Sequence, residues 1–177
     1  MPIPEFIVET RKKIGHDMMW MPAICAVVLR DPTDATANSA WAVPEVLLVK
    51  RADNGEWTPI TGIADPNEEP HDCAVREVEE ETGIRTRPAG ILGVGATGFI
   101  THANGDNACY MSTQLRMEPE DPSAEPVVGD DESIEVGWFP ISQMPVTNPK
   151  WRLAIADAAA HRRHPERFTP RMGLSKR

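Results

Sequence analysis

Basic side chains are in short supply in this 177-residue sequence, where 18 lysines and arginines face 27 aspartates and glutamates for a formal net charge of −9. Surfaces that bind long nucleic acids or anionic lipids are basic, so this balance argues against nucleic-acid and membrane partners. A polyanionic small-molecule substrate would need positive charge supplied at the site. Metal ions are the obvious supply.

Cysteine is scarce as well, and the three residues of this type are far apart, at Cys25, Cys73 and Cys109. They are odd in number and form no CxxC pair, which argues against a disulfide framework and against a zinc site. Reduced, unpaired cysteines are typical of a cytoplasmic protein.

Long apolar runs are missing too. The longest one, residues 23–29, is too short to cross a bilayer. The N-terminus carries Glu5 and Glu9 among apolar residues and shows no signal-peptide pattern. We therefore expect a soluble cytoplasmic protein without a membrane partner.

The composition that remains is that of a globular protein, with 41% hydrophobic and 25% charged residues. The length fits one domain with a full hydrophobic core. The 17 prolines indicate many loops and stiff turns. We expect residues 1–177 to form a single domain.

The order of patterns along the chain predicts an α+β fold. Strand-like runs occupy residues 23–30, 45–53, 57–61, 91–100, 107–117 and 133–140, and residues 31–44 form a loop or hairpin connection. Helical patterns occupy residues 5–20, ending near Gly15, then 69–82, and finally 147–162, where Asn148 caps the helix and Pro149 begins it. Helices packed on a mixed or antiparallel sheet follow from this order.

Residues 1–20 form an N-terminal helical extension with two candidate roles. The helix would be a substrate lid or dimer contact, or it would be an additional helix that covers the core. The second role is favoured because a helical pattern alone says little about function. A homodimer is compatible with this sequence.

The helix expected at residues 69–82 is unusually acidic along one side. At about 100° per residue, Cys73, Glu77, Glu80 and Glu81 share that side, while Arg76 points toward solvent. Carboxylates three and four residues apart repel each other on a helix. Hard divalent cations prefer oxygen ligands and would offset this repulsion, whereas the alternative is a solvated acidic face.

The spacing around this helix is more specific than the acidic run itself. Gly62 is followed after five residues by Glu68, and then after seven by Arg76-Glu77-Val78, one residue, Glu80-Glu81, one residue and Gly83-Ile84. This pattern resembles the motif of the Nudix hydrolases at every defined position. The resemblance implies an α/β/α sandwich with a mixed central sheet, and a loop–helix–loop that binds divalent metals and cleaves a diphosphate linkage.

The resemblance also implies roles for individual residues. Glu77, Glu80 and Glu81 would bind Mg²⁺ or Mn²⁺, with the carbonyl of Gly62 as a further ligand, and Glu77 and Glu80 count among the catalytic residues. Glu68 and Arg76 would hold the loop to the helix.

The resemblance further implies a general base in a late acidic loop, where we favour Glu132 because it stands six residues before Trp138, the spacing of several similar Nudix proteins. Asp130, Asp131 and Glu135 are alternatives, and so is a loop that is merely acidic and exposed.

The favoured function is a magnesium-dependent hydrolase that cleaves the diphosphate linkage of a small nucleoside diphosphate derivative or nucleotide. Two alternatives share the fold: a nucleotide sensor that does not cleave its ligand, and an isomerase like isopentenyl-diphosphate isomerase, which would need a catalytic cysteine. Four aromatic residues could stack on a base, although core packing is the favoured role for Trp57, Phe99, Tyr110 and Trp138. The HRRH run at 161–164 is expected on the surface.

Overall fold

The computed structural model describes residues 4–32 and 43–173, so most of the predicted 31–44 connection lies outside the described residues. The helices are α1 (Glu5–Ile14), α3 (Pro70–Thr82) and α4 (Pro149–Arg163), followed by a 3-10 turn at Pro165–Arg167. The strands are β1 (Met19–Arg30), β2 (Glu45–Arg51), β3 (Trp57–Thr58), β4 (Ile60–Ile63), β5 (Thr86–Ala96), β6 (Ile100–Thr101), β7 (Asn107–Pro119), β8 (Ser133–Pro140) and β9 (Arg171–Met172).

The strands form a mixed sheet in the order β3-β2-β1-β7-β5-β9. β1 pairs in parallel with β7, from Met19 opposite Ala108 to Val28 opposite Met117. β4 lies antiparallel to β1, and β8 lies antiparallel to β2. The expected mixed sheet is thus confirmed, and β1 is its centre.

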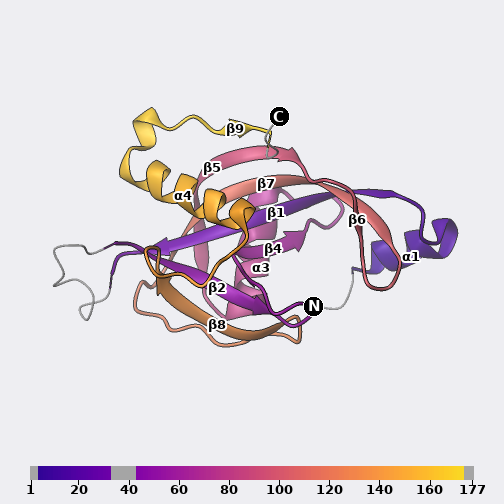
Figure 1. Ribbon diagram of the computed structural model, residues 1–177, viewed down its shortest axis with the longest axis horizontal. Coiled ribbons are helices and arrows are strands. Elements are labelled where there is room, and N and C mark those ends of the chain that lie inside the picture. Colours follow the sequence, from indigo (N-terminus) through magenta and orange to yellow (C-terminus); the bar gives the residue numbers. More distant parts are fainter. Residues whose placement is uncertain (1–3, 33–42, 174–177) are drawn as a thin grey trace.

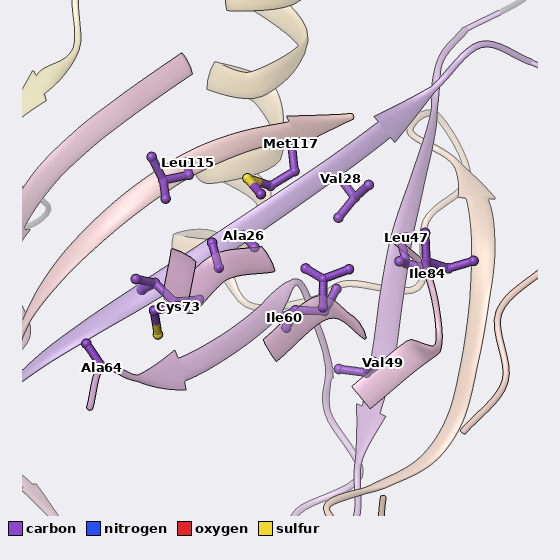
Figure 2. Packing of buried hydrophobic residues seen from close by; sticks show 13 residues of the cluster. Ala26, Val28, Leu47, Val49, Ile60, Ala64, Cys73, Ile84, Leu115 and Met117 are labelled. Atoms are coloured by element: carbon purple, nitrogen blue, oxygen red, sulfur yellow. The ribbon is translucent and has the colours of Figure 1, made fainter. Parts of the chain in front are cut away.

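Two helices cover opposite faces of this sheet (Figure 1). Side chains of β1 alternate between the faces, as they must in a strand. Ile24, Ala26 and Val28 pack with the buried side of α3, as Figure 2 shows for Ala26 and Val28. Cys25, Val27 and Leu29 instead pack with α4. β1 therefore carries a continuous apolar run because both of its faces are buried.

Most predicted elements occur, with shifted ends. The C-terminal helix begins at Pro149, and the Asn148 side chain accepts a hydrogen bond from the backbone N–H of Lys150, as predicted for its cap. The expected strand at 57–61 is divided into β3 and β4 on either side of Pro59, which has no N–H to donate. β9 was not predicted.

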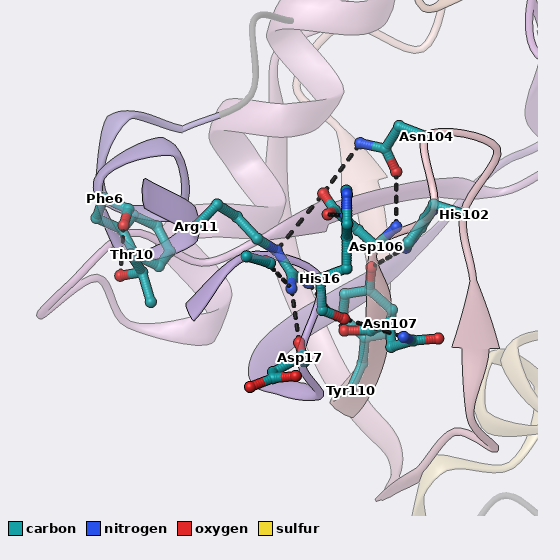
Figure 3. Close-up of polar contacts among 11 residues, drawn as sticks. Phe6, Thr10, Arg11, His16, Asp17, His102, Asn104, Asp106, Asn107 and Tyr110 are labelled. Atoms are coloured by element: carbon teal, nitrogen blue, oxygen red, sulfur yellow. Dashed lines mark hydrogen bonds and ion pairs between the residues drawn. The ribbon is translucent and has the colours of Figure 1, made fainter. Parts of the chain in front are cut away.

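The N-terminal helix covers one end of the core. Ile7 is buried with Met21 and Ala108, so the role of a covering helix matches the packing. Arg11 fastens the helix by donating from Nη2 to the carbonyl of Asn107 at 2.8 Å, and it forms an ion pair with Asp106 (Figure 3). The helix ends as predicted near Gly15, whose φ is 59°.

All three cysteines lie in the described part of the chain, where they are buried and unpaired. The prediction that they form no disulfide framework agrees with this arrangement. Within residues 4–32 and 43–173, no helix is long and apolar enough to cross a membrane.

Candidate active site

The acidic helix is bounded by the residues that its ends require. α3 starts at Pro70, where the missing N–H of proline costs nothing, and it ends before Gly83, which has a left-handed φ of 68°. The N–H of Gly83 closes the last turn on the carbonyl of Glu79. The predicted helix over residues 69–82 is therefore confirmed almost to the residue.

Gly62 lets this helix approach the sheet closely. The glycine lies on β4, and a Cβ at this position would overlap the side chain of Glu77. Only 3% of Glu77 is exposed. The first glycine and the first glutamate of the helical motif are thus brought together because no side chain separates them.

Glu68 and Arg76 connect the loop before the helix to the helix itself. Arg76 donates from Nε and Nη2 to the two carboxylate oxygens of Glu68, at 2.7 and 2.8 Å. These hydrogen bonds lower the pKa of Glu68 to about 2. The predicted contact between loop and helix is present.

The solvent orientation expected for Arg76 was wrong. Its Nη1 donates to Glu77 at 3.0 Å and to Glu80 at 3.2 Å, so the guanidinium lies along the acidic side of α3. Cys73 was also misplaced, because it belongs to the buried core and not to the acidic side. In both cases a neighbouring segment determines the orientation, which helical periodicity does not describe.

Two glutamates of α3 are buried, which is costly for carboxylates. Burial raises the pKa of Glu77 to about 7, and the charges of Glu80 and Glu132 act in the same direction, while Arg76 opposes them. Burial raises the pKa of Glu81 to about 8, with further contributions from Glu77, Asp130 and Glu132. Without a cation, the raised pKa values keep these two carboxyl groups largely protonated up to about neutral pH.

This donor set suits a hard divalent cation. All of its groups are carboxylate oxygens, and a bound cation would relieve their mutual repulsion. Glu77 and Glu81 are buried, whereas the side chain of Glu80 is 44% exposed. Among the described residues, no three acidic, histidine or cysteine side chains are close enough to form a finished metal site. The residues fit the metal in type and in charge, and Arg76 Nη1 offsets part of the charge of Glu77 and Glu80.

The acidic loop that precedes β8 lies near the C-terminal end of α3, where Glu81 is located. Ser133 at the start of β8 donates from Oγ to Glu81 at 3.5 Å, and the charge of Glu132 raises the pKa of both buried glutamates. Glu135 instead forms an ion pair with Lys50 at 2.5 Å. The loop therefore brings Glu132, and not Glu135, toward the buried carboxylates.

Sequence reasoning missed Ser133 and Gly129. The N–H of Gly129 donates to the carbonyl of Glu81 at 3.0 Å. Both residues are ordinary members of an acidic loop, and no local pattern identifies them. Their contacts to α3 exist only in the folded chain.

Three of the four aromatic candidates pack as predicted. Trp57, Tyr110 and Trp138 are partly buried against hydrophobic clusters. Phe99 is 82% exposed, so its predicted core position was wrong. In the HRRH run, Arg163 and His164 are exposed as predicted, whereas His161 is partly buried and accepts a hydrogen bond from Arg116 Nε at 2.9 Å.

A cavity of ≈ 400 Å³ opens between α1 and the loop that carries Glu68. Its apolar lining includes Phe6, Ile24 and Met111. None of the four carboxylates at positions 77, 80, 81 and 132 belongs to this lining. The cavity is therefore adjacent to the candidate active site but separate from it.

We expect the metal-free protein to lose stability as pH rises from 6.5 to 8.5. The pKa values of Glu77 and Glu81 in the native state, about 7 and 8, lie above the ordinary glutamate value of 4.5. Native protein therefore binds these protons more tightly than unfolded protein, and the resulting stability is lost as pH passes through 7 and 8. The loss is on the order of 2 kcal/mol.

Melting temperature in the presence of a chelator measures this loss. The window starts at pH 6.5 because His161, whose pKa is lowered by burial, gives the opposite slope below its usual value. Saturating Mg²⁺ should flatten the profile because it competes with the protons. A metal-free melting temperature that stays constant or rises over this window would contradict the prediction.

The protein-family model of the NUDIX domain matches residues 19–162 of this chain. This chain therefore belongs to the Nudix family. It is 30% identical over 105 residues to the NAD-capped RNA hydrolase NudC of Pseudomonas putida, in an alignment that covers 57% of this chain and 34% of the relative. The chain thus spans only a minor part of that protein's length.

Solved structures share the fold. The ADP-ribose pyrophosphatase of Streptococcus suis superposes with a TM-score of 0.60 at 18% identity, covering 86% of this chain and 98% of the other. A MutT Nudix hydrolase from Burkholderia pseudomallei superposes with a TM-score of 0.55 at 26% identity, covering 78% and 98%. These similarities confirm the predicted α/β/α sandwich.

Proposed function

We propose that this protein is a divalent-metal-dependent hydrolase that cleaves the diphosphate linkage of a small nucleoside diphosphate derivative. The observation that carries the proposal is the pair of buried glutamates on the motif helix, Glu77 and Glu81, with raised pKa values beside the late acidic loop. Perturbed carboxylates of this kind cluster at functional sites.

In this proposal Glu77, Glu80 and Glu81 hold Mg²⁺ or Mn²⁺ together with the carbonyl of Gly62. When bound, the metal would neutralise the diphosphate and lower the pKa of a coordinated water. Glu132 takes a proton from the attacking water. The water oxygen becomes bonded to one phosphorus, the bond from that phosphorus to the bridging oxygen breaks, and the bridging oxygen leaves with the second phosphoryl group. Two monophosphates result.

The alternatives are less well supported. A sensor without catalysis has no need to keep all three helical carboxylates, yet this chain has them. An isomerase with a catalytic cysteine needs a reactive thiolate, but burial raises the pKa of Cys25 to about 12 and raises that of Cys73 as well. Such thiols are inert at neutral pH.

The substrate proposal leads to a test with a panel of compounds. With Mg²⁺ we expect turnover of ADP-ribose, NAD or a UDP-sugar, each yielding two monophosphates. Free NAD should be cleaved with a higher kcat/KM than NAD-capped RNA, because a net charge of −9 repels a long polyanion. A preference for the capped RNA would contradict this substrate class.

The same panel separates hydrolase from sensor. A protein that releases no monophosphate with Mg²⁺ or Mn²⁺, but whose melting temperature rises with a nucleotide, would be a sensor. Release of monophosphate establishes the hydrolase directly.

We also propose that the flanking segments belong to the same domain as the matched region. Ile7 of α1 is buried against Met21 and Ala108. At the other end, Arg171 forms an ion pair with Asp157 of α4, and β9 extends the sheet along β5. Limited proteolysis should leave both segments attached.

A further inference from the structure

The acidic loop that precedes β8 is attached directly to the C-terminal end of α3. The last carbonyls of a helix have no partner within the helix. Here the backbone carbonyl of Thr82 accepts a hydrogen bond from the N–H of Val127. The backbone carbonyl of Glu81 accepts one from the N–H of Gly129, and both distances are 3.0 Å. Residues 127–129 therefore cap α3 from a distant part of the chain.

Gly129 allows this attachment because it has no side chain. A Cβ at this position would overlap the carbonyl oxygen of Glu80 and lie 3.1 Å from the carbonyl carbon of Glu81. The φ of Gly129 lies outside the left-handed region, so another residue could adopt its backbone conformation. Space, and not conformational freedom, requires the glycine.

The residues after Gly129 are held on their other side by Ala52, which follows the end of β2. The carbonyl of Glu132 accepts a hydrogen bond from the N–H of Ala52 at 2.7 Å. The N–H of Glu132 donates to Asp130 Oδ1 at 3.1 Å. Ser133 then contacts Glu81. The short segment from Gly129 to Ser133, which includes Glu132, thus lies between the end of α3 and the end of β2.

We propose that Gly129 is a positioning residue that sets the distance between Glu132 and the carboxylates of α3. The proposal rests on the proposed function, in which Glu132 takes the proton from water. A general base must stand within hydrogen-bond reach of that proton, and a misplacement of 1 Å can cost about 100-fold in rate.

Gly129→Ala tests the proposal, with Gly98→Ala as the matched control. Gly98 is exposed, and a Cβ there meets nothing within 4 Å. We expect kcat of the Gly129 variant to fall about 100-fold with KM nearly unchanged, while the Gly98 variant keeps wild-type values. The Mg²⁺-induced rise in melting temperature should remain in both, since we expect the loop to move away from the hydrogen-bonded helix and the helical carboxylates to stay in place.

A double variant separates positioning from a general loss of structure. If Gly129 acts through Glu132, the Gly129→Ala change should add little to the loss caused by Glu132→Gln, since residues that act as a unit are not additive. Full additivity of the two losses would overturn the positioning role.

Amide exchange in the metal-free protein gives a result that does not depend on activity. The N–H groups of Val127 and Gly129 should exchange slowly in wild type and fast in Gly129→Ala, with the core strands unaffected. Should this variant fail to fold, Val127→Pro removes one of the two hydrogen bonds without adding a side chain at Gly129, and the same loss of kcat is expected.

The outcomes distinguish this proposal from the proposed function. An active wild-type enzyme whose Gly129→Ala variant matches Gly98→Ala overturns the positioning role alone. A wild-type protein that cleaves no compound of the panel removes the hydrolase function, and this role with it.

Discussion

Glu81→Gln should abolish most turnover and leave the metal-free protein at least as stable as wild type. Glu81 is only 6% exposed and its pKa is raised to about 8, so its carboxylate is unfavourable in the native state without a cation. Glutamine has the same shape and no charge, and it can still accept the hydrogen bond from Ser133. The metal, in contrast, loses a charged oxygen ligand.

We expect the rate to fall by more than about 100-fold, which is the upper end of the loss when an outer-shell partner of a metal is removed. Melting temperature measured with and without Mg²⁺ completes the test. Since a ligand that binds only the native state must stabilise it, Mg²⁺ should raise the melting temperature of wild type more than that of the variant.

Glu79→Gln is the matched control. Glu79 lies on the same helix and forms an exposed ion pair with Arg85 at 3.2 Å. The same change of charge at this position should leave both turnover and the Mg²⁺ effect intact. Equal activity and equal Mg²⁺ shifts in wild type and the Glu81 variant would mean that Glu81, although buried, holds no catalytic metal.

The elements that could be predicted are those that local rules determine. α3 has proline at its first position and glycine at its end, and α4 has an asparagine cap, so their bounds follow from neighbouring residues. β5 was predicted to start at residue 91, but it begins at Thr86. Pro88 and Gly90 interrupt the strand-like sequence pattern in the first half of β5. The strand accommodates them with irregular pairing to β7.

The sequence predicts a set of residues for the candidate site but not their arrangement. Motif spacing identifies Glu77 and Glu81, and the sheet buries them. The motif predicted the contact of Arg76 with Glu68, but it did not predict that the same guanidinium also donates to Glu77 and Glu80, because a helical projection places Arg76 toward solvent. The contact of Gly129 with Glu81 joins residues that are far apart in the sequence, and it depends on the paths of β7 and β8.

Glu132→Gln should lower kcat by about 10²- to 10⁴-fold, the usual contribution of a general base. The Mg²⁺-induced rise in melting temperature should be nearly unchanged, because in this proposal the group moves a proton and does not hold the cation. The backbone of Glu132 is held by Ala52 at 2.7 Å. Glutamine at this position should therefore keep the loop in place.

Glu135→Gln provides the comparison within the same acidic segment. Glu135 is occupied by Lys50 at 2.5 Å, and its side chain is 55% exposed, so its loss should change kcat only a few-fold. Steady-state rates of both variants at saturating Mg²⁺ and substrate decide between the two carboxylates. A Glu132→Gln enzyme that runs at full speed would move the base to Asp130, Asp131 or a carboxylate of α3. A slow Glu135→Gln enzyme beside it would place the base on β8, where the Lys50 ion pair would have to open during turnover.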